Sequence, residues 1–185
     1  MKNLVVVLAG PSGVGKDSVM LGLIEKHPNT YQKFANTTTR EKRPGEVEGI
    51  NYYYVNAEEF LRRVKDGEVF EHVHHYGNYY GMSKKAIEAV WKQSKIAINN
   101  CQINGIRETK KLYGNNCLTV FISAPRAVVE ARLIGRGDSE EQRKIRADYD
   151  EFMALEPEFD AGLENKNLEK AIDDLHNIIL KYQGE

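Results

Sequence analysis

The stretch LAGPSGVGKDSV, residues Leu8–Val19, carries three glycines, a lysine and two serines. Within it, Gly10–Lys16 matches the pattern G-x-x-x-x-G-K. An apolar run over Leu4–Ala9 precedes the pattern, and a segment with helical periodicity over Lys16–Lys26 follows it. Between a strand and a helix, such a loop binds phosphate through its backbone N–H groups, with the lysine charge at the outer phosphates. The stretch therefore predicts a binding site for a nucleotide's polyphosphate.

The rest of the chain alternates short apolar runs with helical segments. The alternation predicts an α/β protein with a three-layer fold of the P-loop NTPase type, in which helices cover both faces of a parallel central sheet. Further strands are expected at Ile96–Ile98 and Leu118–Ser123, and further helices at Ser83–Lys92, Asn104–Tyr113, Arg126–Ile134 and Leu168–Tyr182.

Two stretches interrupt this alternation. Residues 34–81 contain short strands rich in Tyr and Phe and one helical segment at Ala57–Lys65, so they predict a small inserted subdomain. Residues 135–155 are highly charged and poor in apolar residues, which predicts a mobile lid that is helical after Asp138. Together they leave a single domain whose core comprises residues 1–33, 82–134 and 156–185.

Composition limits the partners and the compartment. The chain has 26 basic and 27 acidic residues, a balance that argues against a general binder of nucleic acid or membrane surfaces. No apolar run approaches the roughly 18 residues of a membrane-spanning helix. Cys101 and Cys117 show neither metal-binding spacing nor a disulfide framework. We expect a cytoplasmic protein that acts as a monomer or a homodimer.

Asp17 occupies the position at which most loops of this spacing carry Ser or Thr, whose hydroxyl commonly holds Mg²⁺. We expect Ser18, the next hydroxyl along, to contact phosphate or a water bound to the metal. For Asp17 two interpretations stay open. In the first, it adds a carboxylate to the magnesium site and contacts the metal through water. In the second, it lies in solvent, where its negative charge at the helix N-terminus is favourable.

Two arginines predict a second anion site. Arg40 and Arg43 are three residues apart, directly before Pro44-Gly45, and two guanidinium groups on one loop suit a phosphomonoester. The glycine loop and this arginine pair are therefore two separate sites at which phosphate groups are expected.

Several longer motifs strongly resemble guanylate kinases. These are GPSGVGK at Gly10–Lys16, TTREKRPGEVEGINYYYV at Thr38–Val55 and FEHVHHYGNYYG at Phe70–Gly81. The resemblance continues through RLIGRG and FDAGLENKNLEKA, so it covers nearly the whole chain. It implies a nucleoside monophosphate kinase with a GMP-binding insert and a helical lid, which converts GMP or dGMP to GDP or dGDP with ATP and Mg²⁺.

The resemblance places the acceptor nucleotide on the insert. It implies that Glu71 accepts hydrogen bonds from the ring nitrogen and the amino group of guanine. Asn36, where the family usually has Ser, and Gln102 stand at two further substrate-binding positions. The residues implied to grip the acceptor phosphate are Arg40, Arg43, Tyr52 and Tyr80.

The resemblance also assigns the donor side. Arg136 would lie beside the adenine and phosphates, and Arg146, allowing one deletion, near the transferred group, so that both act in catalysis with Lys16. Arg132 is a further basic residue of the lid, and Asn165 matches a position near the adenine. The implied ATP-binding residues are Gly10, Pro11, Ser12, Gly13, Val14, Gly15, Lys16, Asp17, Ser18, Arg132 and Asn165.

The chain departs from the family pattern at base-reading and metal-facing positions. Met82 stands where the family has Ser or Thr, and the family's L-D-I-D-x-Q-G becomes NNCQING at residues 99–105. Two carboxylates thereby become the amides of Asn100 and Gln102, which accept hydrogen bonds but bring no charge. We hypothesise that Asp17 restores near the metal the charge lost at Asn100.

Two other functions stay open. GKDS after the glycine loop, together with Asn99, is similar to ribose bisphosphate phosphokinases, which phosphorylate a sugar phosphate, although those enzymes generally lack the intact TTRxxRPGE segment. A catalytically silent binding module resembling guanylate kinase is the second alternative. Such modules typically lose the phosphate loop, whereas Lys16, Arg40 and Arg43 are all present.

Overall fold

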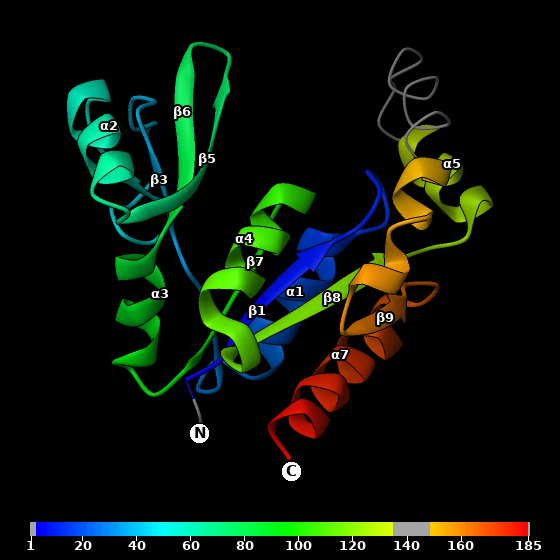
Figure 1. Ribbon diagram of the computed structural model, residues 1–185. Helices are drawn as coiled ribbons and strands as arrows, with labels where there is room; N and C mark the ends of the chain where they lie inside the picture. The colour runs from blue at the N-terminus through cyan, green and yellow to red at the C-terminus, as the bar shows by residue number, and fades with distance from the viewer. Residues whose placement is uncertain (1–2, 135–148, 185) are drawn as a thin grey trace.

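The computed structural model describes residues 3–134 and 149–184 and is built around a five-stranded parallel sheet (Figure 1). The apolar run after the N-terminus forms its central strand, β1 (Val5–Ala9), whose five residues are all buried. The strand order is β2 (Tyr31–Lys33), β7 (Ile96–Asn100), β1, β8 (Cys117–Ser123) and β9 (Ala161–Glu164). The expected parallel central sheet is confirmed.

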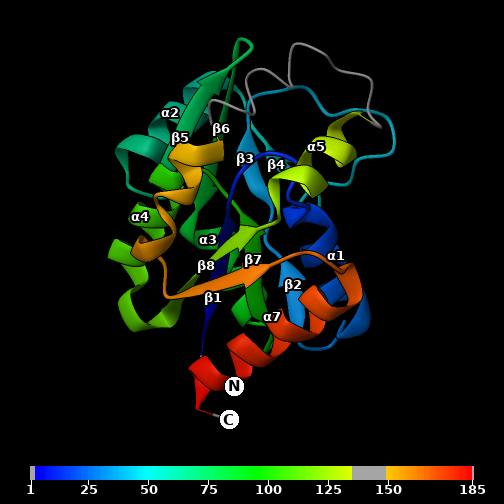
Figure 2. The same ribbon diagram turned by 90° about the vertical axis from the view of Figure 1, so that its right-hand side faces the viewer.

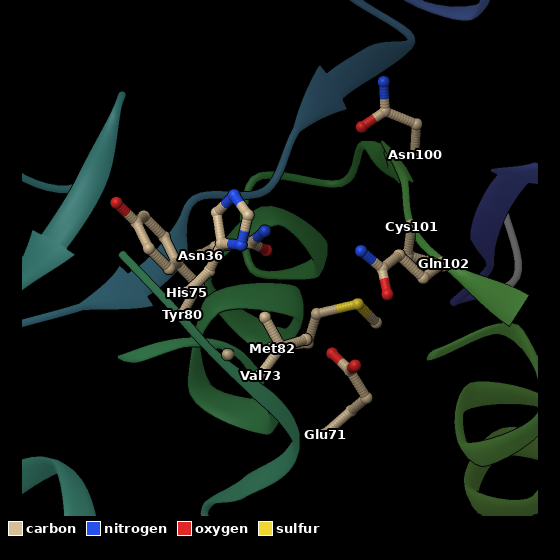
Figure 3. Close-up of a pocket in the computed structure, with 10 residues that line it drawn as sticks. Asn36, Glu71, Val73, His75, Tyr80, Met82, Asn100, Cys101 and Gln102 are labelled. Carbon is tan, nitrogen blue, oxygen red and sulfur yellow. The ribbon is translucent and has the colours of Figure 1, made fainter. Parts of the chain in front are cut away.

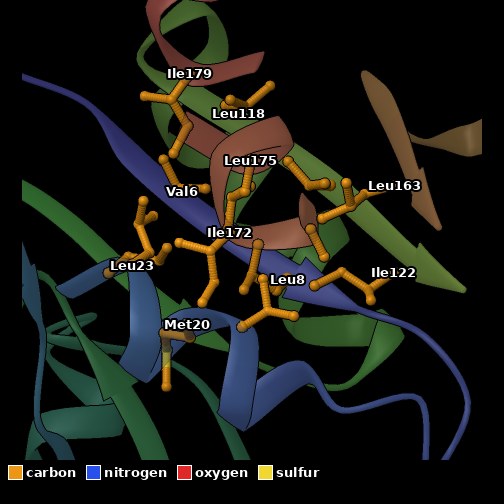
Figure 4. Packing of buried hydrophobic residues seen from close by; sticks show 14 of the residues in the cluster. Val6, Leu8, Met20, Leu23, Leu118, Ile122, Leu163, Ile172, Leu175 and Ile179 are labelled. Carbon is orange, nitrogen blue, oxygen red and sulfur yellow. The ribbon is translucent and has the colours of Figure 1, made fainter. Parts of the chain in front are cut away.

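Helices cover both faces of this sheet (Figure 2). Side chains alternate along β1, so Val6 and Leu8 pack on one face with residues of α1 (Lys16–Lys26) and α7 (Leu168–Gln183) (Figure 4). Val5 and Val7 pack on the other face with residues of α3 (Lys84–Trp91) and α4 (Ile103–Tyr113). These two apolar clusters make the three-layer fold.

A second sheet stands beside the carboxyl ends of the central strands (Figure 1). Its order is β4 (Tyr52–Tyr54), β3 (Asn36–Thr38), β6 (Asn78–Ser83) and β5 (Val69–His75). Helix α2 (Ala57–Lys65) packs on β5 through the buried Phe60. On the far side of the loop after β1 lies α5 (Arg126–Ile134).

Most expected elements are present with small shifts of their ends. The observed bounds of α1, α2 and α5 equal those predicted. Four short elements without an apolar run were not predicted. Two are strands, β2 with the sequence YQK and β9 with the sequence AGLE. The other two are the 3-10 helices η1 (Gly114–Asn116) and η2 (Glu156–Glu158). Residues 135–148, which include most of the expected lid, lie outside the described residues. Among the described residues, no helix combines the length and the apolar character needed to cross a bilayer.

Gly10 fixes the approach of the loop to β8. Its φ is +147°, and a Cβ added there would lie 2.0 Å from the backbone oxygen of Ile122. Gly10→Ala should therefore lower the free energy of unfolding by about 2–5 kcal/mol, through backbone strain and overpacking. Urea unfolding followed by the fluorescence of Trp91 measures this loss.

Gly67→Ala is the matched control for that prediction. Gly67 also has a positive φ of +68°, but a Cβ there would meet nothing within 4 Å. The control should cost only about 1–2 kcal/mol for a left-handed alanine. Equal losses in the two variants would contradict the steric role of Gly10.

Candidate active site

The glycine loop places Lys16 at the N-terminus of α1, which has no side-chain cap. Gly15 has a φ of +89° and is the N-cap of α1, and it forms no side-chain capping bond with the first turn, which leaves N–H groups for an anion. Lys16 Nζ donates to the carbonyl oxygens of Gly10 at 2.8 Å and Pro11 at 2.9 Å. Burial lowers the pKa of Lys16, while the neighbouring Asp17 carboxylate opposes that shift.

Arg132 and Asn165 hold the loop from behind. The Arg132 guanidinium donates to the carbonyl oxygen of Val14 at 3.0 Å, and Asn165 Nδ2 donates to the same oxygen at 2.8 Å. Both residues also line a cavity of about 300 Å³ together with Gly13, Gly15, Ser18 and Leu168. The two residues expected at the ATP site therefore lie next to the loop, and they also fix its backbone.

Asp17 and Asn100 are brought into contact by the fold. Asn100 ends β7 and Asp17 lies in the first turn of α1. Asn100 Nδ2 donates to Asp17 Oδ1 at 2.7 Å. The carboxylate at position 17 and the amide at position 100 thus occupy neighbouring places beside Lys16.

Two cavities adjoin at the end of β7. The loop cavity, of about 430 Å³, is lined by Gly10, Ser12, Lys16 and Phe152. The insert cavity, of about 260 Å³, is lined by residues of β3, β5 and β6, namely Asn36, Glu71, Val73, His75, Tyr80, Gly81 and Met82 (Figure 3). Asn100, Cys101 and Gln102 line both. The volume of the insert cavity is just below the usual range of about 300–1,000 Å³ for small-molecule sites, so it suits one ring system.

Glu71 turns its carboxylate into the insert cavity from β5 (Figure 3). A Cβ added at Gly105 would lie 3.4 Å from Glu71 Cδ, so the first turn of α4 passes close to the carboxyl group. Burial raises the pKa of Glu71, and burial followed by the charge of Glu71 raises the pKa of the Cys101 thiol. Within the described residues, the side chain of Glu71 has no hydrogen-bond partner, so its carboxylate is available as an acceptor.

Arg40 is held at the edge of the insert by Glu46. An Arg40 Nη2–Glu46 Oε1 ion pair of 2.7 Å fixes the guanidinium, which also lies 5.4 Å from the centre of the Tyr52 ring. Glu46 Oε2 accepts from the Tyr54 hydroxyl at 2.7 Å and from the Arg43 backbone N–H at 2.8 Å. The hydrogen bond from Arg40, then those from Arg43 and Tyr54, lower the pKa of Glu46 to about 2.

Two tyrosines connect the loop that carries Arg40 and Arg43 with the insert cavity. The ring centroids of Tyr52 and Tyr80 are 6.0 Å apart, and Tyr80 lines the cavity, whereas Arg40, Arg43 and Tyr52 do not. Sequence reasoning missed Glu46, although the acid follows Arg43 by three residues.

Three further positions complete the comparison with the sequence. Arg136 and Arg146 lie outside the described residues. Phe152, from the helical residues 149–153, lines the loop cavity and was not predicted, because a lone aromatic residue in a charged segment carries no distinguishing signal. Asn99 is 2% exposed and lines neither cavity.

The chain is similar to known proteins over nearly its whole length. The profile of the family described as guanylate kinase matches residues 2–182. The guanylate kinase of Chlamydia felis is 35% identical over 177 residues, covering 94% of this chain and 85% of that protein. That of Helicobacter pylori is 38% identical over 170 residues, covering 90% and 81%. The crystal structure of guanylate kinase from Anaplasma phagocytophilum aligns with a TM-score of 0.71 and 26% identity, over 98% of this chain and 87% of that one. The chain belongs to the guanylate kinase family.

Proposed function

We propose that this protein transfers the γ-phosphoryl group of MgATP to the phosphate of GMP or dGMP. The observation that carries the proposal is the pair of adjoining cavities, one containing Lys16 and the other Glu71, with Asn100, Cys101 and Gln102 common to both. A donor phosphate chain at the loop and an acceptor base at Glu71 would then meet above residues 100–102. The family of the chain supports the same reaction.

The chemistry requires placement of charge more than covalent assistance. An acceptor phosphate is already ionised, so no strong general base is needed. Lys16 and the N–H groups of the loop would neutralise the donor phosphates. Arg40, Arg43, Tyr52 and Tyr80 would hold the acceptor phosphate, and Arg136 and Arg146 would close over the transferred group and exclude water.

The Asp17 carboxylate, held by Asn100, suits a magnesium site, and Ser18 is the next hydroxyl along the chain. Within residues 3–134 and 149–184, no three His, Cys, Asp or Glu side chains gather closely enough to hold a metal by themselves. Mg²⁺ commonly takes one or two carboxylates plus phosphate oxygens and water, which matches one carboxylate beside a phosphate loop. Mg²⁺ would screen the charge of the phosphates. Asp17 and Ser18 would hold it through water, and Asn100 would orient the Asp17 carboxylate.

This assignment predicts a change in metal dependence. Asp17→Asn should raise the Mg²⁺ concentration for half-maximal activity by about 10–100-fold, the usual cost of losing a group that supports a metal site. Titration of Mn²⁺ by electron paramagnetic resonance with bound ADP measures the affinity directly. Glu25→Gln, which removes one exposed carboxylate from the same helix, is the control.

An exchange variant sharpens this test. Combining Asp17→Ser with Asn100→Asp moves the carboxylate across the 2.7 Å contact to the other partner. It should return the Mn²⁺ affinity to within a few-fold of the original protein. An unchanged affinity in Asp17→Asn would identify Asp17 as a solvated helix-start residue instead.

A substrate panel tests the function itself. ADP formation should be followed with GMP, dGMP, AMP, dTMP, UMP and ribose bisphosphate, and GMP and dGMP are expected to be phosphorylated best. Activity with the sugar phosphate alone would overturn the proposal in favour of the phosphokinase alternative. Absence of turnover with every acceptor would favour a binding module.

The proposal includes a cytoplasmic location and either a monomer or a homodimer. Cys101 and Cys117 are free thiols, which agrees with a reducing compartment.

A further inference from the structure

The backbone fixes the orientation of one buried amide, that of Asn99 on β7. Asn99 Nδ2 donates to the carbonyl oxygen of Phe34 at 2.9 Å. Asn99 Oδ1 accepts from the backbone N–H of Asn100 at 2.9 Å. Because a backbone carbonyl can only accept and a backbone N–H can only donate, the reversed orientation of this side chain is excluded.

Asn99 in turn orients Asn36 on β3. The second hydrogen of Asn99 Nδ2 faces Asn36 Oδ1, at a nitrogen–oxygen distance of 3.3 Å. Only an acceptor atom can stand there, so the oxygen of the Asn36 amide is committed to Asn99. Asn36 lines the insert cavity near His75 and Tyr80 (Figure 3), and within the described residues its Nδ2 forms no hydrogen bond. The group that Asn36 offers to a ligand is therefore a donor.

We propose that Asn99 is a positioning residue that holds Asn36 as a fixed hydrogen-bond donor to the carbonyl oxygen of the acceptor's base. The inference rests on the proposed function, and it names the feature by which that site selects among bases. Asn36 supplies a donor and Glu71 supplies an anionic acceptor in the same cavity.

This pair of groups distinguishes a keto base from an amino base. Guanine presents a carbonyl oxygen next to ring and amino N–H groups, and thus complements one donor and one two-oxygen acceptor. Adenine presents an amino donor and an unprotonated ring nitrogen. The amino donor of adenine would face the donor of Asn36, and its ring nitrogen, an acceptor, would face the acceptor oxygens of Glu71. Polar groups left unpaired in this way in a closed site oppose binding.

Other residues of the cavity cannot replace a fixed amide. Met82 has no polar hydrogen. Gln102 is exposed, and its side-chain amide forms no hydrogen bond within the described part of the chain, so it can turn either its donor or its acceptor toward a base. An amide that is free to turn can bind either a keto base or an amino base, whereas an amide with a fixed orientation binds only one of the two classes.

The sequence departures at these two positions are coupled by this contact. The family pattern has Ser where Asn36 stands and Leu where Asn99 stands. A hydroxyl rotates freely and can donate without a partner that orients it, whereas an amide has one donating end and needs one. Asn99 thus supplies what the amide at position 36 requires.

A double-mutant cycle tests the inference. The proteins are Asn99→Leu, Asn36→Ser and the variant with both changes, assayed for kcat and KM with GMP, IMP, AMP and dUMP. Asn99→Leu should lower the GMP-to-AMP ratio of kcat/KM by about 10-fold, mainly through a higher KM for GMP. The double variant should recover most of that ratio, because its hydroxyl needs no orientation. Asn115→Leu, the same change at an exposed site before β8, should leave the ratio unchanged.

A second variant covers the case in which Asn99→Leu does not fold. Asn36→Asp keeps the shape of a partly exposed side chain but turns an acceptor into the cavity. It should lower kcat/KM for GMP by about 100-fold while its melting temperature stays close to that of the original protein.

The outcomes separate this inference from the proposed function. If no monophosphate is phosphorylated by the original protein, the proposed function fails. If GMP is phosphorylated but Asn99→Leu loses activity on all acceptors in equal proportion and Asn36→Ser does not rescue it, Asn99 is only structural. An unchanged kcat/KM for GMP in Asn36→Asp would also overturn the inference.

Discussion

Replacing Lys16 with methionine is expected to lower kcat by about 10²–10³-fold, the cost of removing one fixed charge or donor from a phosphoryl-transfer site. The Lys16 Nζ atom is held by the carbonyl oxygens of Gly10 and Pro11 and lies in the wall of the loop cavity. Methionine keeps the length of the side chain without its charge. Because charge on the donor phosphates grows during transfer, the loss should appear more in kcat than in the affinity for ATP.

Coupled detection of ADP and the binding of a fluorescent ATP analogue measure the two effects separately. Lys26→Met is the matched control, because Lys26 ends the same helix and pairs with Asp173 at the surface. A kcat for Lys16→Met within a few-fold of that of the control would contradict the role of the loop.

Replacing Glu71 with glutamine is expected to lower kcat/KM for GMP by about 10²–10³-fold. In the proposed site, the carboxylate would offer two acceptors to the ring and amino N–H groups of guanine. Glutamine would keep one acceptor oxygen but turn its NH₂ group toward the second N–H donor of guanine. That donor would then be left without an acceptor. The change should be much smaller for AMP, so the GMP-to-AMP ratio should fall with the rate. Glu68→Gln, at an exposed site just before β5, controls for the loss of charge.

The same residue predicts a pH dependence. Burial raises the pKa of Glu71 above that of an ordinary glutamate, and only the ionised form accepts from both donors of guanine. KM for GMP should therefore rise as the pH falls through the raised pKa, at a higher pH than an exposed glutamate would give. Glu71→Gln should abolish that rise. A rise that persists in the variant would assign the titration to another group.

The three inner strands of the central sheet, β7, β1 and β8, were predictable because they carry continuous apolar runs. A parallel strand that is buried on both faces reads as a run of valine and isoleucine, as β1 does. The glycine motif then located the phosphate loop, since few other sequences suit that turn. By contrast, β2 and β9 lie at the two edges of the sheet and have three and four residues, too few for a periodic signal.

The site was predictable where a motif recurs and unpredictable where it depends on tertiary contact. The hypothesis that linked Asp17 with Asn100 placed two residues 83 positions apart together, and their side chains are 2.7 Å apart. It arose from a missing charge, which a sequence can reveal. The ion pair of Glu46 with Arg40 lies within one loop whose conformation no motif reveals. The contact of Asn99 with Asn36 depends on how β3 lies against β7, which the sequence does not give.

The hold of Glu46 on Arg40 has a consequence for how an acceptor is captured. A free arginine must give up many rotamers when it grips a ligand, but this one has given them up during folding. In the proposed reaction, an incoming dianion would therefore meet a guanidinium whose rotamer is already fixed. Acceptor affinity would then depend on how well ordered the segment between β3 and β4 is, so loosening that segment would weaken capture without altering any atom that contacts the ligand.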